Sequence, residues 1–108
     1  MRTPKEASMA GNPLEALGRL DPPILEHLKT GDQFVFADGA LPGKVKLLMA
    51  LAFDAAFGAS DGVAALAQRA VRAGATSAEI AEAVRVAWHL AGVGSLYTAS
   101  RGLKDLLV

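Results

Sequence analysis

Cysteine is absent from this chain of 108 residues. Its absence excludes disulfide bonds, thiolate catalysis and zinc sites built on thiolates. Aromatic residues make up only 6% of the chain, and alanine and leucine supply most of its apolar content. This composition favours packed helices over a β-sandwich, because strands are usually rich in aromatic and β-branched residues.

An excess of charge of one sign is also missing. Eleven Lys and Arg residues balance eleven Asp and Glu residues. A nucleic-acid surface needs a basic stripe, so we expect no nucleic-acid partner. The longest apolar run, Leu47–Phe53, is far shorter than the roughly 20 residues that span a bilayer. No apolar run follows the charges of Met1–Asn12, so we expect a cytoplasmic protein that does not enter a membrane.

Helix start and stop signals divide the chain. The small, polar residues 1–12 are expected to form a loose N-terminal arm, and residues 13–108 a single helical domain. Only Gln33–Ala37 has the alternation of a strand. The fold class predicted is therefore all-α, a bundle of about five helices. The expected helical segments are a short turn at Pro13–Leu20, then Pro22–Phe36, Leu41–Phe57, a helix capped by Ser60 or Asp61 and ending near Ala73, a helix from Thr76 to about Ala91, and Ser95–Leu107.

The clearest local signal is Thr76-Ser77-Ala78-Glu79, which has the spacing of a capping box. The Thr76 hydroxyl can accept from the backbone N–H of Glu79, and the Glu79 carboxylate can accept from the N–H of Thr76. Gly74 can end the preceding helix in a left-handed conformation. One helix is therefore expected to stop and another to start within about three residues.

Two of the expected helices, Leu41–Phe57 and the helix from Thr76 to about Ala91, are apolar around most of their circumference. Between Val45 and Phe57 only Lys46 and Asp54 are charged. Such a helix belongs at the centre of a domain or between subunits. Because a small domain cannot cover both helices, we expect a homo-oligomer.

The residues Leu41–Ala52 (LPGKVKLLMALA), Ala70–Ala83 (AVRAGATSAEIAEA) and the glycine-rich break Gly92–Gly94 occur in an order that resembles the carboxymuconolactone decarboxylase family, which includes the alkylhydroperoxidase D-like proteins. The resemblance covers roughly Leu20 to Leu106. It implies an alkylhydroperoxidase D-like all-α bundle assembled as a trimer or hexamer.

In the peroxidase branch of that family, the chemistry comes from a Cys-x-x-Cys-x-x-x-His run, assisted by a glutamate on the preceding helix. Counting back from Gly74, the cysteine positions fall at Ala59 and Gly62, the histidine at Leu66 and the glutamate at Leu47. None of these side chains can titrate. The resemblance therefore argues against thiol-peroxidase activity, and the two leucines suggest that the site is apolar packing.

Asp54 and His89 are the candidate catalytic residues. Asp54 lies in an apolar run, where an unpaired carboxylate has a raised pKa and can act as a general acid or base. The plainer interpretation is that Asp54 pairs with an arginine or caps a neighbouring helix. His89 shares a helical polar arc with Glu82 and Arg85, which can move a proton and bind an anion, or can simply be a solvated or intersubunit stripe.

Arg85, Trp88 and Tyr97 are the candidate substrate-binding residues. Trp88 and Tyr97 flank the glycine-rich break, where they could line a pocket for a planar or lactone-like ligand, although such residues are more often core or interface anchors. The two histidines form no metal-ligand set, so neither a metal nor another cofactor is expected. Two hypotheses stay open: a decarboxylase-type enzyme acting on a small lactone-like anion, and a catalytically degenerate oligomeric binding or scaffold subunit.

Overall fold

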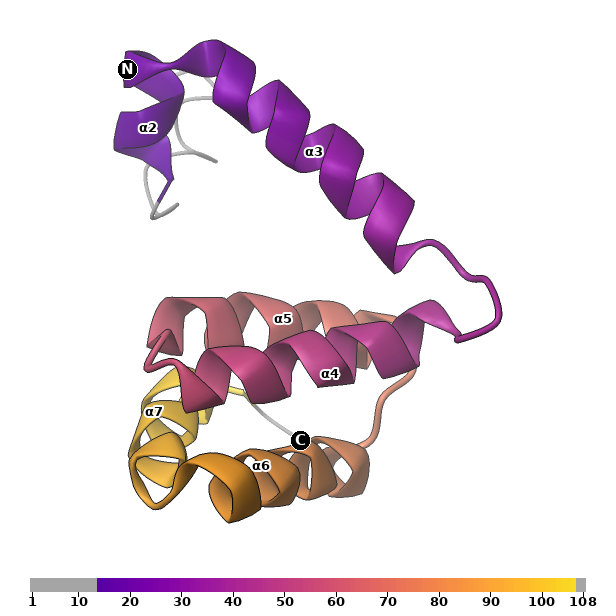
Figure 1. The fold of residues 1–108 in the computed structure, drawn as a ribbon, viewed down its shortest axis with the longest axis vertical. Coiled ribbons are helices and arrows are strands. Elements are labelled where there is room, and N and C mark those ends of the chain that lie inside the picture. Colours follow the sequence, from indigo (N-terminus) through magenta and orange to yellow (C-terminus); the bar gives the residue numbers. More distant parts are fainter. Residues whose placement is uncertain (1–13, 107–108) are drawn as a thin grey trace. The chain divides into compact units, whose positions relative to one another are not determined.

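A computed structural model describes residues 14–106 of the chain, and the predicted N-terminal arm lies outside them. These residues form six helices and no strand, which confirms the all-α class. The short turn expected before Pro22 is a helix of its own, and Gln33–Phe36 continues a helix instead of forming a strand. The helices are α2 (Glu15–Leu20), α3 (Pro22–Phe36), α4 (Gly43–Ala56), α5 (Ser60–Arg72), α6 (Ser77–Ala91) and α7 (Gly94–Leu103) (Figure 1).

The chain divides into two compact units, Met1–Val35 and Phe36–Val108. The single domain expected over residues 13–108 stays a prediction. None of the helices within residues 14–106 combines the length and apolar character that a membrane crossing requires.

The first unit contains α2 and most of α3. An ion pair of 2.6 Å joins Arg19 to Glu15 one turn away in α2. Pro22 and Pro23 occupy the first turn of α3, where a missing N–H removes no helical hydrogen bond. No residue of either helix is fully buried, and the apolar side chains of Ile24, Leu28, Phe34 and Val35 in α3 are exposed.

The second unit is a bundle in which α4 packs against α5, α6 and α7 (Figure 1). Leu51 of α4 and Val63 of α5 are the largest completely buried side chains. Alanines make up most of the rest of the core, so the helices approach closely. The core members besides those two are Leu47, Ala55, Ala67, Ala70, Ala75, Ile80, Ala87 and Ala99. The expectation that α4 is covered on nearly all sides is met only in part, because Met49, Phe53 and Phe57 are exposed.

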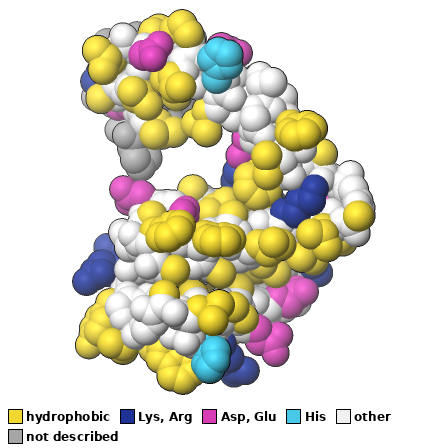
Figure 2. Space-filling model, in the orientation of Figure 1, with side chains coloured by type: hydrophobic (Ala, Val, Ile, Leu, Met, Phe, Trp, Pro, Cys, Tyr) yellow, Lys and Arg dark blue, Asp and Glu magenta, His cyan; other side chains and the backbone are white. Residues whose placement is uncertain are grey.

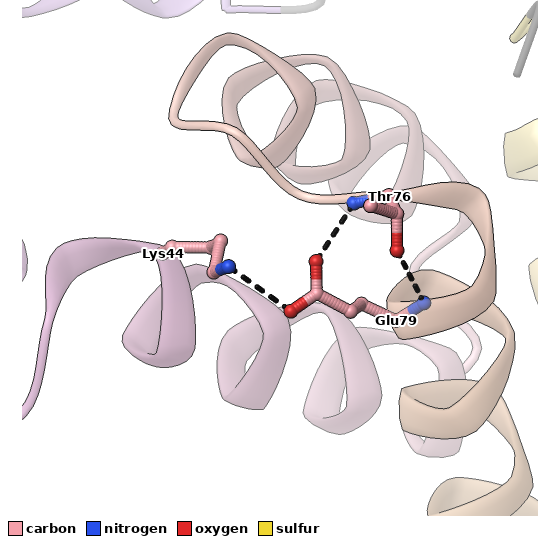
Figure 3. A network of polar contacts seen from close by, with 3 residues as sticks. All are labelled: Lys44, Thr76 and Glu79. Atoms are coloured by element: carbon pink, nitrogen blue, oxygen red, sulfur yellow. Dashed lines mark hydrogen bonds and ion pairs between the residues drawn. The ribbon is translucent and has the colours of Figure 1, made fainter.

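The capping box is present at the start of α6 (Figure 3). The N–H of Glu79 donates to Oγ1 of Thr76 at 3.1 Å, and the N–H of Thr76 donates to Oε1 of Glu79 at 2.9 Å. The other carboxylate oxygen of Glu79 pairs with Nζ of Lys44 at 3.0 Å, which joins the first turns of α4 and α6. Gly74 has a φ of +98°, as expected for a glycine that ends a helix.

The prediction that Ser60 or Asp61 is the N-cap residue of α5 is wrong. Ala59 is the N-cap residue, and no side chain accepts a hydrogen bond at this position. Ser60 and Asp61 lie inside the first turn instead, where the acidic side chain of Asp61 faces the positive end of the helix dipole.

The contact between α5 and α7 depends on Gly102. A Cβ added there would lie 2.7 Å from the carbonyl oxygen of Ser60 and 2.7 Å from Cβ of Val63. The same side of α7 buries Ser95, Thr98 and Ala99. Small side chains on this face therefore let α7 close one end of the bundle.

Candidate functional site

The positions at which the resembling peroxidases carry their chemistry contribute here to packing and to a helix start. Leu47 is 6% exposed and belongs to the hydrophobic core, and Leu66 packs against that core. Ala59 is the N-cap residue of α5, and Gly62 follows in its first turn. Neither leucine carries an acid, a base or a nucleophile, so these positions provide apolar contact.

Asp54 lies beside one of these positions. A Cβ added at Gly62 would overlap the carboxylate of Asp54, so this carboxylate occupies the space that a side chain at position 62 would need. Within residues 14–106, no ion pair or side-chain hydrogen bond holds the Asp54 carboxylate, so the expected pairing with an arginine or a helix cap is not observed there. Burial raises the pKa of Asp54 above its ordinary value.

The polar arc of Glu82, Arg85 and His89 is present on α6, and all of these residues are exposed. The arc lies opposite the buried residues Ile80 and Ala87, which face the rest of the bundle. In the part of the chain that the structure describes, no ion pair or side-chain hydrogen bond involves any member of the arc.

The structure therefore does not gather the candidate residues within one chain. The Asp54 carboxylate lies against α5, whereas Arg85 and His89 point away from the core on α6. Trp88 is about half exposed, and its ring is tilted by 56° to the ring of the neighbouring His89, with ring centroids 6.3 Å apart. Tyr97 is 64% exposed on α7. The roles assigned to these residues stay predictions.

Among the described residues of the second unit, cavities include three whose linings contain no candidate catalytic or substrate-binding residue. One of about 340 Å³ lies between α5 and α7, with Arg101 and Lys104 opposed by Asp61 and Asp105. One of about 670 Å³ lies at the start of α4 beside Arg69, whose guanidinium stacks 4.9 Å from the ring centre of Phe36. Among residues 14–106, no three His, Asp or Glu side chains lie close enough together to hold a metal ion.

The third cavity is an apolar groove of about 300 Å³ between α4 and α6. We call it the α4–α6 groove and define it by Met49, Phe53, Phe57, Val86 and Leu90, together with alanines of both helices. The groove contains no reactive side chain, so the sequence motifs did not predict it. The sequence pattern that could have predicted the groove is a spacing of four between large apolar residues. Met49, Phe53 and Phe57 have this spacing along α4, and Val86 and Leu90 have it along α6. Residues with this spacing lie on one side of a helix, so each helix has a second apolar stripe outside the core.

The fold and these positions define a class of protein. It is a small all-helical protein in which a capping box begins α6, and it has apolar residues at the positions where the resembling peroxidases carry their chemistry. The family model described as "Carboxymuconolactone decarboxylase family" matches residues 22–105, and the chain belongs to this family. The match extends from the first residue of α3 to beyond the end of α7. Neither a curated protein nor a solved structure matches the chain significantly.

Proposed function

We propose that this chain is a homo-oligomeric binding or scaffold subunit of the carboxymuconolactone decarboxylase family without thiol-peroxidase activity. The observation that carries the proposal is which side chains fill the positions where the resembling peroxidases have their cysteines, histidine and glutamate. Leu47 is part of the core, Leu66 packs against it, and the Asp54 carboxylate occupies the space next to Gly62. A thiolate mechanism needs a nucleophile and a proton-transfer partner, and these positions supply neither.

Uncovered apolar surface supports the oligomeric part of the proposal. Large hydrophobic side chains are exposed in the second unit on α4, α6 and α7, and those of α3 are not buried either. On the visible face of the second unit, hydrophobic side chains gather along α4 (Figure 2). Monomeric proteins rarely leave contiguous apolar surface of this kind in water, and association covers it.

The test combines assembly and activity on the purified chain. Light scattering coupled to size exclusion is expected to give three or six times the mass of the 11.1 kDa chain. A coupled peroxide-reduction assay is expected to give the rate of the buffer alone. A monomer would contradict the oligomeric part, and peroxide turnover above the buffer rate would contradict the absence of peroxidase activity.

A second candidate function is decarboxylation of a small lactone-like anion, with Asp54 and His89 transferring the proton and Arg85, Trp88 and Tyr97 binding the substrate. The observations that favour it are the position of the Asp54 carboxylate, partly buried against Gly62 without an ion-pair partner among the described residues, and the raised pKa that this burial gives it. In one chain these residues lie apart, so this function needs residues from a neighbouring subunit.

The decarboxylase candidate is tested by following carboxymuconolactone consumption. Turnover that drops at least about a hundredfold in Asp54→Asn and His89→Ala, and is unchanged in Lys29→Ala on the exposed surface of α3, would favour it, since general acid–base groups contribute about that much. Turnover that survives both substitutions would eliminate the residue assignments. No turnover would favour the binding or scaffold subunit.

A further inference from the structure

The cavity between α5 and α7, which we call the α5–α7 cavity, is lined by charged side chains of both signs. Its volume of about 340 Å³ lies in the range of small-molecule sites. Arg101 and Lys104 contribute positive charges at the end of α7, and Asp105 follows them with a negative charge. Asp61, in the first turn of α5, supplies the second negative charge. Two positive and two negative groups therefore border one small space.

These four charged groups do not neutralise one another in the structure. Within residues 14–106, no ion pair or side-chain hydrogen bond involves any of the four. All four side chains are exposed, so water is their only competitor for another partner. Opposite charges that line one cavity without meeting leave room for a molecule that carries both charges.

Close packing fixes the two walls of the cavity relative to each other. Gly102 belongs to the lining, and a Cβ added there would lie 2.7 Å from the carbonyl oxygen of Ser60 on the opposite wall. A glycine at this position therefore lets α7 approach α5 closely. A site held between two packed helices exists before the ligand arrives, which reduces the entropy lost on binding.

The chemistry of the lining selects the class of ligand. Guanidinium and ammonium groups bind a carboxylate through charge-assisted hydrogen bonds, and a carboxylate binds an ammonium group in the same way. A simple anion would be repelled by Asp61 and Asp105. A simple cation would be repelled by Arg101 and Lys104. A free α-amino acid carries a carboxylate and an ammonium group close together and has little or no net charge, so it matches the lining.

We propose that the α5–α7 cavity binds a free α-amino acid. Arg101 of α7 binds its carboxylate and Asp61 of α5 binds its ammonium group, so that the ligand bridges the two helices. None of the residues that line this cavity is a candidate catalytic or substrate-binding residue. The inference therefore goes beyond the proposed function and does not depend on whether the chain assembles.

The first experiment titrates a panel of the free L-amino acids into the isotopically labelled full chain and follows the backbone amide resonances. At least one member is expected to shift the amides of Ser60–Ala64 and of Arg101–Leu106. Its counterparts that lack the ammonium group or the carboxylate, which for L-alanine are propionate and ethylamine, are then titrated. Each counterpart is expected to bind at least about tenfold more weakly, because it leaves one charged group of the site without its partner.

The second experiment removes one charge of the site at a time. Arg101→Gln and Asp61→Asn are each expected to weaken the binding at least about tenfold. Arg72→Gln and Glu26→Gln are the matched controls, because they remove the same charges at exposed positions outside the cavity. Both controls are expected to bind like the parent chain, and circular dichroism checks that all four variants fold.

Three results would overturn the inference. One is the absence of amide shifts at the α5–α7 cavity with every amino acid of the panel. Another is propionate or inorganic phosphate that binds as tightly as the amino acid, because the cavity would then be an anion site. The third is binding that survives both substitutions in the site. Peroxide turnover or a monomeric chain, by contrast, would contradict the proposed function and leave this inference standing.

Discussion

The carboxylate of Asp54 lies against Gly62, in the space that a side chain at position 62 would fill. The two residues come from different helices, α4 and α5, and each determines what the other position can hold. The family's second cysteine position is thus occupied in space by a residue eight positions earlier in the sequence.

Gly62→Ala is expected to push the Asp54 carboxylate out toward solvent. The overlapping atoms are the end of a flexible side chain, so the cost is small, and alanine gains up to about 1 kcal/mol over glycine as a helix former. The free energy of unfolding, measured in urea, should therefore change by less than about 1 kcal/mol. A double-mutant cycle with Asp54→Ala should show coupling between the two positions. Strictly additive effects would mean that the carboxylate does not meet position 62 in solution.

The stability of the chain should depend on the ionisation of Asp54. Burial raises its pKa in the folded state above the ordinary 3.8, so the folded chain holds this proton more tightly than the unfolded chain. The stabilisation is complete below pH 3.8 and is lost as the pH rises through the raised pKa. As the pH rises through this range, the free energy of unfolding of the parent chain should fall relative to that of Asp54→Asn. Asp54→Ala should show the same difference in slope, and a flat difference for both variants would contradict the prediction.

Glu79 should give a pH dependence of the opposite sign. The backbone N–H of Thr76, and then Lys44, lower the pKa of this carboxyl below its ordinary 4.5. Its stabilisation is present above pH 4.5 and is lost as the pH falls through the lowered pKa. Glu79→Gln should remove this loss of stability on acidification, and Lys44→Met should remove only part of it. Equal acid sensitivity in the parent chain and Glu79→Gln would exclude the carboxylate as its source.

Gly102→Ala should be destabilising by about 1–3 kcal/mol. The added methyl group would overlap a carbonyl oxygen of Ser60 and the β-branched side chain of Val63, and neither can rotate away. Gly94→Ala in the same helix is the matched control, since a Cβ there meets nothing within 4 Å. The midpoints of thermal unfolding should separate the two variants, and similar midpoints would argue against a close α5–α7 contact.

A glutamate at position 47, where the peroxidase branch has one, should unfold the bundle and should not restore peroxidase chemistry. Leu47→Glu places a carboxylate in the hydrophobic core, where no partner awaits it, and should cost several kcal/mol or raise the pKa of the new group strongly. Leu47→Met keeps the volume and should cost less than about 1.5 kcal/mol. Circular dichroism in increasing urea compares the two. A stable Leu47→Glu variant with an ordinary carboxyl pKa would mean that position 47 is open to water.

The sequence predicted the helices well because their boundaries depend on neighbouring residues. Thr76 and Glu79 lie within one turn, so their reciprocal hydrogen bonds follow from spacing alone. The left-handed Gly74 follows from the same local argument. The cap of α5 was wrong because Ala59, rather than a polar residue, precedes that helix and no side chain caps it.

The candidate site was harder to predict, because it depends on which helix faces meet. The composition of α4 suggested a helix covered on nearly all sides, but Phe53 and Phe57 lie outside the core. Periodicity placed Arg85 and His89 on one side of α6, yet it could not relate that side to Asp54. The α4–α6 groove is lined by residues of two separate helices, and α5 lies between these helices in the sequence, so neither helix reveals the groove alone.

By itself, the sequence determined the all-helical class, the capped turn before α6, the family, and the absence of cysteine. Each of these follows from residue types and short spacings. Only the tertiary structure decided that the Asp54 carboxylate fills the space beside Gly62, that Leu47 belongs to the core, and that an uncharged groove opens between α4 and α6. Packing decides these features, because a side chain's surroundings depend on the helices brought against it and not on its neighbours in the chain.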